Sequence, residues 1–398
     1  MAQPYPSPSL VCLFQDSPKG FRTIVMPEDK PKVDPDGRSQ IEELLSLCRL
    51  RSDSSRTDIF HNKQPLQRPL WARGAYGGQI VAQSLLAAHE TVEGGFVVHS
   101  IHCHFLRAAR PDLSTAYRVD RMRDGKSFAN RVVYAEQNNQ LVFMATASFT
   151  RGSTQGHTLQ HAVPIPREER PPEDHPDVAT QSAAGQGREG QPCDCVRSAL
   201  KTDGPPHTRR FRQWIRARGQ IGEKPLQACG AGDGTSSPST AAGSERRDNH
   251  HAHLAALAYM TDNYFIGTAF RAHSASRFSN RSFPYPMPPE SNGNAVDAEA
   301  GRMYFDALAE EETHDNGEAP DNDKHVSMVA SLDHTIYFHR PLDFRADAWL
   351  LAEMECPWTD DERGVVVERV WNHEGVLVAT CIQEGVVRLS PQRSKNKL

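Results

Sequence analysis

Gly74-Ala-Tyr-Gly-Gly-Gln79 directly precedes Ile80-Val-Ala-Gln-Ser-Leu-Leu-Ala-Ala88 in this chain of 398 residues. The glycines interrupt the preceding structure, and the apolar residues that follow leave only Gln79 and Gln83, four positions apart, as large polar side chains. This spacing predicts a mostly buried helix. Four segments with the composition of β-strands follow it, at 97–106, 113–121, 127–137 and 141–150. The first folded block is therefore one helix and then four strands.

A second block repeats this order later in the chain. The apolar segment 253–264 predicts a helix, and strand-like segments follow at 331–340, 348–355, 364–371 and 375–387. Phe105-Leu-Arg107 matches Phe338-His-Arg340, 233 residues later, and Leu141-Val-Phe-Met-Ala-Thr146 matches Val376-Leu-Val-Ala-Thr380 at an offset of 234. The pattern predicts a duplicated α+β unit, each copy wrapping a sheet around one long helix. Chance similarity between strand-rich segments is the alternative.

Proline-rich, glycine-rich and charged stretches separate and interrupt the two blocks. The expected organisation is a disordered N-terminal segment 1–37, an N-terminal unit 38–164, a charged linker 165–210, a C-terminal unit 211–390 with flexible insertions 226–248 and 275–325, and a tail 391–398.

Composition excludes several classes of protein. The 45 Lys and Arg residues against 50 Asp and Glu give a net charge of −5, so there is no overall bias toward nucleic acid. No apolar run reaches the roughly 18 residues of a membrane span, so we expect no integral membrane segment. The first thirty residues lack the pattern of a secretory signal. The eight cysteines are scattered, apart from Cys193-Asp-Cys195, which favours a reducing compartment.

The common catalytic and metal-binding motifs are absent from the sequence. There is no G-x-S-x-G or H-E-x-x-H motif. Asp124-Gly-Lys-Ser127 lacks the first glycine of a phosphate-binding loop, because Asp120 stands there, and it is better interpreted as a turn. The cluster His99, His102 and His104 has no carboxylate or cysteine spaced to complete a metal site. We therefore expect neither a metal nor a cofactor.

Three polar residues of the second block fit a structural role less easily. Asp262 ends the apolar helix, Ser331 directly precedes a strand, and Gln383 interrupts the apolar strand 376–387. The repeat partner of Gln383 is Phe149, so one copy has an amide where the other has an aromatic ring. A buried amide without partners costs about 1–3 kcal/mol, so a buried Gln383 needs a hydrogen-bonding neighbour. The alternative is that Gln383 faces solvent.

Eight segments resemble, in order, those of the acyl-CoA thioesterase II family, the TesB-like double-hotdog enzymes. The matching segments are Gly77-Gly-Gln-Ile-Val-Ala-Gln-Ser-Leu85, Val98-His-Ser-Ile-His-Cys-His-Phe-Leu-Arg107, Arg121-Met-Arg-Asp-Gly-Lys-Ser-Phe128, Met144-Ala-Thr-Ala-Ser-Phe149, Trp214-Ile-Arg-Ala-Arg-Gly219, Leu257-Ala-Tyr-Met-Thr-Asp262, Ser331-Leu-Asp-His-Thr-Ile-Tyr-Phe-His-Arg-Pro341 and Val378-Ala-Thr-Cys-Ile-Gln-Glu-Gly385. Residues 1–37, 226–248 and much of 275–325 lie outside the resemblance.

The resemblance implies an α+β tandem hotdog fold and hydrolysis of fatty acyl-CoA to free fatty acid and CoA. It assigns the catalytic roles to Asp262, Ser331 and Gln383, and the family's usual Thr is Ser at position 331. Such a site needs only an oriented water and a stabilised oxyanion, with backbone N–H groups at the start of a hotdog helix as oxyanion donors. Because Phe149 replaces the amide in the first copy, we expect one active site, with the first copy a structural partner lining the acyl tunnel. Other substrate-binding residues are not assigned.

Two other functions stay open at this point. One is a non-catalytic acyl-CoA-binding hotdog protein, and the other is a hotdog enoyl-CoA hydratase, although Gly267 stands where that enzyme would have a histidine. The chain ends in Asn396-Lys397-Leu398, which resembles the Ser-Lys-Leu peroxisomal signal. We expect a peroxisomal protein, with a cytoplasmic protein carrying a basic tail as the alternative. A homo-oligomer is compatible with the sequence.

Overall fold

The computed structural model describes 13–16, 22–25, 39–50, 57–69, 72, 74–151, 159–166, 170–172, 192–198, 204–222, 249–278, 309, 312 and 321–391. Its helices are α1 (Gln40–Leu45), α2 (Gly77–His89), α3 (His250–Met260) and α4 (Gly267–Arg271), with a 3₁₀ turn at Pro206–Thr208.

A 14-stranded sheet runs through both repeats. The first repeat contributes β3 (Leu47–Leu50), β4 (Thr57–Asn62), β5 (Phe96–Phe105), β6 (Ala116–Asp124), β7 (Phe128–Gln137) and β8 (Gln140–Arg151). The second contributes β9 (Cys193–Arg197), β10 (Phe211–Ala217), β11 (Ala275–Ser276), β12 (Asp321–Ser331), β13 (Asp333–Phe338), β14 (Leu350–Asp360), β15 (Arg363–Trp371) and β16 (Leu377–Leu389). Their order is β3-β4-β6-β7-β8-β5-β13-β16-β15-β14-β10-β9, and β12 adds to β16 and carries β11.

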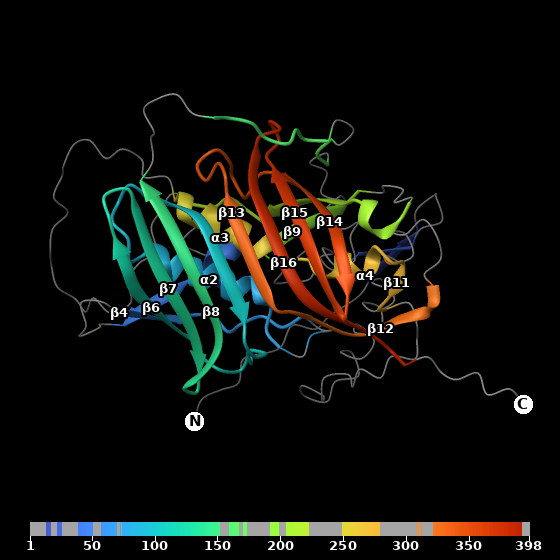
Figure 1. Cartoon of the computed structure of the whole chain (residues 1–398), viewed down its shortest axis with the longest axis horizontal. Helices are drawn as coiled ribbons and strands as arrows, with labels where there is room; N and C mark the ends of the chain where they lie inside the picture. Colours follow the sequence, from blue (N-terminus) through green and yellow to red (C-terminus); the bar gives the residue numbers. More distant parts are fainter. Residues whose placement is uncertain are drawn as a thin grey trace, which may run out of the picture.

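The two repeats join at the seam between β5 and β13. These strands pair antiparallel, from Asp333 opposite His104 to Tyr337 opposite Ser100. The sheet continues across this seam. Figure 1 shows the strands of the first repeat beside those of the second as one curved surface. The seam makes the two copies a single structural unit.

Helices α2 and α3 lie together behind the sheet in Figure 1 and are buried by it. Eleven residues of α2 are buried, from Gly78 to Ala88, and the buried stretch of α3 is 253–260. A helix that is apolar on nearly all sides belongs in a core. One continuous core cluster contains residues of both helices and both repeats. This arrangement confirms the α+β duplication and the four long strands expected after each helix. The expected helix-first order is wrong, because β3 and β4 precede α2 and β9 and β10 precede α3.

Several segments expected to lack structure contain strands. Within 165–210 the structure places β9, which pairs with β10 and buries Cys193 and Cys195 at the edge of the sheet. Within 1–37, β1 (Leu13–Asp16) pairs with β2 (Arg22–Val25) as a hairpin, and β11 and the start of β12 fall within 275–325. Strands as short as β1, β2, β9 and β11 form because a neighbouring strand pairs with them, so their own composition does not predict them. The insertion 226–248 and the signal-like end of the tail lie outside the described residues.

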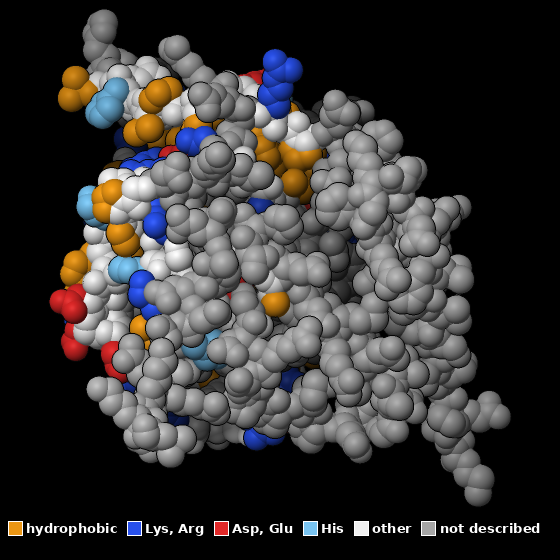
Figure 2. All heavy atoms as spheres, turned by 90° about the vertical axis from the view of Figure 1, so that its right-hand side faces the viewer, with side chains coloured by type: hydrophobic (Ala, Val, Ile, Leu, Met, Phe, Trp, Pro, Cys, Tyr) orange, Lys and Arg blue, Asp and Glu red, His pale blue; other side chains and the backbone are white. Residues whose placement is uncertain are grey.

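Charged side chains of both signs occur on the face of the molecule drawn in Figure 2, where its side chains are described. In Figure 2 acidic, basic and hydrophobic side chains are interspersed along the described edge of that face. No helix of the described part of the chain is long and apolar enough to cross a membrane.

Candidate active site

The predicted site residue Asp262 lies where the end of α3 meets the start of α2. It follows the last residue of α3 by two positions, and its carboxylate accepts a hydrogen bond from the backbone N–H of Gly78 in the first turn of α2. The N-cap residue of α2, Tyr76, makes no side-chain capping bond. A carboxylate at a helix N-terminus is favoured by the unpaired N–H groups and the helix dipole. Asp262 of the second repeat therefore caps the central helix of the first.

The glycine pair that begins α2 makes this approach sterically feasible. A Cβ at Gly78 would lie 2.5 Å from the carbonyl oxygen of Tyr259, and a Cβ at Gly77 would lie 2.8 Å from Oδ2 of Asp262. Real Cβ atoms do not come so close to a fixed backbone. The phenol of Tyr76 strengthens the contact, because its hydroxyl donates to the same Tyr259 carbonyl at 2.7 Å.

Gln383 reaches the same point from the sheet. It is fully buried in β16, so the alternative that it faces solvent is wrong. Its Nε2 donates to Oδ1 of Asp262 at 2.8 Å. Its Oε1 is buried and accepts no hydrogen bond from any described residue. A buried acceptor without a donor is costly, and it marks a place where a water or substrate atom would bind.

Two further residues extend this pair into a network. Gln383 Nε2 lies 3.1 Å from Nδ1 of His334 on β13, and His334 Nε2 lies 3.2 Å from the hydroxyl of Thr261. His334 is fully buried, and burial lowers its pKa to about 3, so the ring is neutral. The network links α3, β13 and β16 behind the carboxylate of Asp262.

Ser331, the third predicted residue, lies nearby without joining the network. It is the last residue of β12, half-buried, and pairs with Gly385, two positions along β16 from Gln383. No described contact joins its hydroxyl to Asp262 or Gln383. The structure thus brings two of the three predicted side chains into direct contact and places the third on the neighbouring strand.

The electrostatics of the site are dominated by burial. Burial raises the pKa of Asp262 to about 6, and the hydrogen bonds from Gln383 and Gly78 offset only part of that shift. The carboxylate is still mostly ionised at neutral pH, yet it is a stronger base than an exposed aspartate. A pKa this close to neutrality suits a group that takes and returns a proton.

A second buried carboxyl lies close to this site. Glu368 on β15 is fully buried, and neither of its oxygens has a nitrogen or oxygen partner among the described residues. Burial and the negative charge of Asp262 raise its pKa well above the usual range, and the Cys381 thiol offsets this only in part. Glu368 is therefore a neutral carboxylic acid at neutral pH.

The comparisons with known proteins match both repeats. Residues 67–150 match the profile of the acyl-CoA thioesterase N-terminal domain, and residues 230–387 match that of the acyl-CoA thioesterase C-terminal domain. Acyl-coenzyme A thioesterase 8 of Mus musculus is 30% identical over 366 residues, covering 85% of this chain and 90% of that protein. The chain belongs to the acyl-CoA thioesterase family. Its Asp262 and Gln383 lie in the segment that matches the C-terminal domain of these thioesterases.

Solved structures confirm the fold of this thioesterase. The acyl-CoA thioesterase II TesB2 from Mycobacterium marinum covers 90% of the chain and 99% of its own length, at 25% identity and a TM-score of 0.56. A protein with a hot dog fold from Alicyclobacillus acidocaldarius covers 88% of the chain at 17% identity and a TM-score of 0.50. The tandem hotdog architecture is therefore shown.

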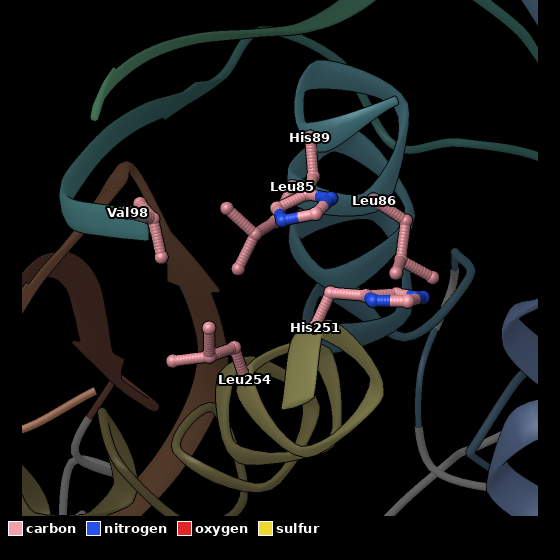
Figure 3. A pocket seen from close by; sticks show the side chains of 6 residues that line it. All are labelled: Leu85, Leu86, His89, Val98, His251 and Leu254. Carbon is pink, nitrogen blue, oxygen red and sulfur yellow. The ribbon is translucent and has the colours of Figure 1, made fainter. Parts of the chain in front are cut away.

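A small pocket with no room for a water molecule lies between the two repeats, at the opposite ends of α2 and α3. His89, the last residue of α2, lies near Phe149, and the centroids of these two rings are 6.2 Å apart. Figure 3 shows His89 stacked over His251 from the start of α3, and their centroids are 5.0 Å apart. The residues that line the pocket are Leu85, Leu86, His89, Val98, His251 and Leu254. No carboxylate is among them.

Three side chains around the candidate site were not predicted from the sequence. Thr261, His334 and Glu368 are all fully buried. The alternation of side chains along a strand could have predicted that two of them are buried. His334 shares a strand face with buried Ile336, and Glu368 shares one with buried Val366. The partners of these groups come from elements far apart in the chain, which one sequence does not reveal.

The histidine cluster considered for a metal has another role. Within the described ranges no group of three or more His, Cys, Asp or Glu side chains is arranged to hold a metal ion. His99 pairs with the hydroxyl of Ser148 at 2.8 Å and His102 with that of Thr335 at 3.3 Å. These contacts link neighbouring strands of the sheet, and the second crosses the seam between repeats.

Proposed function

We propose that this chain hydrolyses acyl-CoA thioesters to a free acid and CoA by direct attack of a water molecule held between Asp262 and Gln383. The observation that supports the proposal is the contact between half-buried Asp262 and fully buried Gln383. An ionised carboxylate accepts a bond from Gln383 Nε2 at 2.8 Å while the other branch of the same amide, Oε1, has no donor. A water placed there could donate one proton to Asp262 and the other to Oε1.

The chemistry then needs no covalent intermediate. The water oxygen attacks the thioester carbonyl carbon while its proton passes to Asp262, which gives a tetrahedral oxyanion. Backbone N–H groups in the first turn of α2 other than that of Gly78, which bonds Asp262, are suited to stabilise that oxyanion, because they lie near Asp262 and the N-cap residue Tyr76 makes no side-chain capping bond. Collapse breaks the C–S bond, and Asp262 returns the proton to the departing thiolate. We assign Ser331 a supporting contact to the water or the substrate.

We further propose one active site per chain. The equivalent place in the first repeat has Phe149 for Gln383 and Thr91 for Asp262, because Thr91 follows the last residue of α2 by two positions as Asp262 follows that of α3. Burial lowers the pKa of the neighbouring His89 to about 4. This place offers neither the carboxylate nor the amide that the mechanism requires. The first repeat instead supplies α2, whose N-terminus completes the site of the second.

We propose a peroxisomal location. A relative from Saccharomyces cerevisiae, 33% identical over 129 residues and covering 32% of this chain and 36% of that protein, is named peroxisomal acyl-coenzyme A thioester hydrolase 1. The Asn396-Lys397-Leu398 terminus offers a route of import. A fluorescent fusion to the N-terminus should co-localise with a peroxisomal marker and become diffuse when the last three residues are removed. A diffuse signal from the full chain would leave the cytoplasmic alternative.

The activity is tested by release of CoA thiol from a panel of acyl-CoAs of increasing chain length, with hydration of 2-enoyl-CoAs followed in parallel. Thiol release without hydration supports the proposed hydrolysis. Tight binding of acyl-CoA without turnover would instead favour the binding protein, and hydration without thiol release would favour the hydratase.

A further inference from the structure

The histidine behind the reacting pair, His334, has a hydrogen-bonding partner at each ring nitrogen, Thr261 at Nε2 and Gln383 at Nδ1. Thr261 Oγ1 lies 3.2 Å from the carbonyl oxygen of Ala258, to which only its hydroxyl proton can bond. The lone pairs of Oγ1 then face Nε2 of His334 at 3.2 Å. A neutral imidazole has one N–H, so that proton lies on Nε2 and Nδ1 is an acceptor.

The acceptor Nδ1 in turn determines how the Gln383 amide lies. Nε2 of Gln383 has two protons and two acceptors, Oδ1 of Asp262 at 2.8 Å and Nδ1 of His334 at 3.1 Å. A flipped amide would place its oxygen against a carboxylate and against a ring lone pair. Both contacts are repulsive, so Oε1 stays on the side where it has no donor within the described residues.

We propose that His334 is a positioning residue for thioester hydrolysis, which keeps the Gln383 amide oriented with Nε2 toward Asp262 and Oε1 toward the attacking water. This inference rests on the proposed function. Asp262 alone can hold the amide only while it is ionised. Once Asp262 takes the proton of the water, its carboxyl becomes a donor that can hydrogen-bond the Oε1 of a flipped amide. The lone pair on Nδ1 of His334 still repels that oxygen.

Rigidity of the ring supports this role. His334 is fully buried, its ring stands edge-on to Phe265 with centroids 5.5 Å apart, and it sits on the strand that pairs with β5 across the seam. The titratable groups that face Asp262 are Tyr76, Tyr259, Cys103 and Glu368. Burial raises the pKa of each of them, so they stay neutral while Asp262 titrates.

Three substitutions separate positioning from packing. His334→Asn keeps an acceptor near the place of Nδ1, His334→Gln puts an amide near Nε2 only, and His334→Phe removes both. A matched control is His339→Asn, because His339 is exposed just after β13 and the hydrogen bond described for its side chain is to the hydroxyl of Thr380. Each variant is compared with the wild type in kcat, KM and the pH dependence of kcat.

His334→Phe should lower kcat by about 10–100-fold with KM little changed, since it loosens the orientation of the water. His334→Asn should retain kcat within a few-fold of the wild type, and His334→Gln should resemble His334→Phe. The acid limb of the kcat profile should move to higher pH in His334→Phe, because a flipped amide stabilises protonated Asp262.

Full kcat in His334→Phe, or equal losses in His334→Asn and His334→Gln, would overturn the proposal. If His334→Phe fails to fold, the comparison of the Asn and Gln variants decides alone. A wild type without thioesterase activity, or full activity in Asp262→Asn, would instead refute the proposed function, and neither result depends on His334.

Discussion

At the scale of single residues, the chemistry of the site follows from burying one carboxylate beside one amide. Asp262 is half-buried among protein atoms, so the free energy of ionising it is higher than in water, and Gln383 and the Gly78 N–H stabilise its charge. The resulting pKa of about 6 keeps the group ionised at neutral pH and basic enough to accept a proton from water.

This shift predicts a pH dependence. Hydrolysis needs ionised Asp262, so kcat should fall as pH decreases through about 6, roughly two units above the midpoint of an ordinary aspartate. The measurement is kcat for thiol release between pH 4.5 and 8.5, with stability checked at each pH. A profile that stays flat down to pH 4.5 would mean that the reaction does not depend on a carboxylate with a raised pKa.

The sequence supplied part of this residue-level account. Comparison of the two repeats singled out Gln383, because its partner position holds Phe149, and the family resemblance pointed to Asp262. It could not supply His334 or Thr261, whose roles depend on contacts between β13, β16 and the end of α3. Ser331 remains a prediction, since no described contact joins its side chain to the reacting pair.

At the scale of elements, the close contact between the start of α2 and the end of α3 builds the site. Gly78→Ala should therefore reduce stability by about 1–3 kcal/mol, because its Cβ would meet the Tyr259 carbonyl at 2.5 Å. It should also lower kcat by tenfold or more, because α2 would shift away from Asp262. Chemical denaturation and thiol release measure the two effects.

Gly94→Ala is the control for that substitution, since a Cβ at Gly94 meets nothing within 4 Å. It should leave both stability and kcat close to those of the wild type. If the two variants behaved alike, the close packing of α2 on α3 would not be what positions the site.

The buried acid on β15 gives a second prediction at this scale. The folded-state pKa of Glu368 is raised, so wild-type stability decreases as pH rises above the usual glutamate pKa. Glu368→Gln keeps the shape without the charge, so its stability relative to the wild type should increase from pH 5 to pH 8. Denaturation midpoints at the two pH values test this, with exposed Glu374→Gln as the control. A difference that did not grow with pH would contradict a buried neutral acid.

Strand prediction succeeded where alternation was long and failed at the sheet edge. The strands β5 to β8 and β13 to β16 begin and end within a few residues of the expected bounds. β9 was missed because Cys193–Arg197 is short and lies in a charged, proline-rich region. Its formation depends on β10, which offers an unpaired edge.

At the scale of the whole molecule, the duplication and the seam combine two hotdog units into one cooperative structure. The core cluster and the sheet run through both repeats. Thermal unfolding should therefore be a single transition. Tryptophan fluorescence, which reports mainly on Trp214, Trp349, Trp358 and Trp371 of the second repeat, should coincide with far-ultraviolet circular dichroism. Two separated transitions would show that the repeats unfold independently.

The repeat offsets of 233 and 234 residues predicted this duplicated architecture before any coordinates. They could not predict that the candidate site includes residues of both copies, because the contact of Asp262 with Gly78 of α2 joins residues 184 positions apart. The asymmetry between Gln383 and Phe149 makes one end of the helix pair polar and the other apolar.

The most direct test of the account is the steady-state rate of CoA release by Asp262→Asn, with Asp343→Asn as a matched control at an exposed aspartate. Removing a general base costs about 10²–10⁴-fold in rate. For Asp262→Asn we expect a loss of that size in kcat, with KM within a few-fold of the wild type and an unchanged fold. For Asp343→Asn we expect wild-type kinetics. A folded Asp262→Asn protein that releases CoA at the wild-type rate would contradict the assignment of this site.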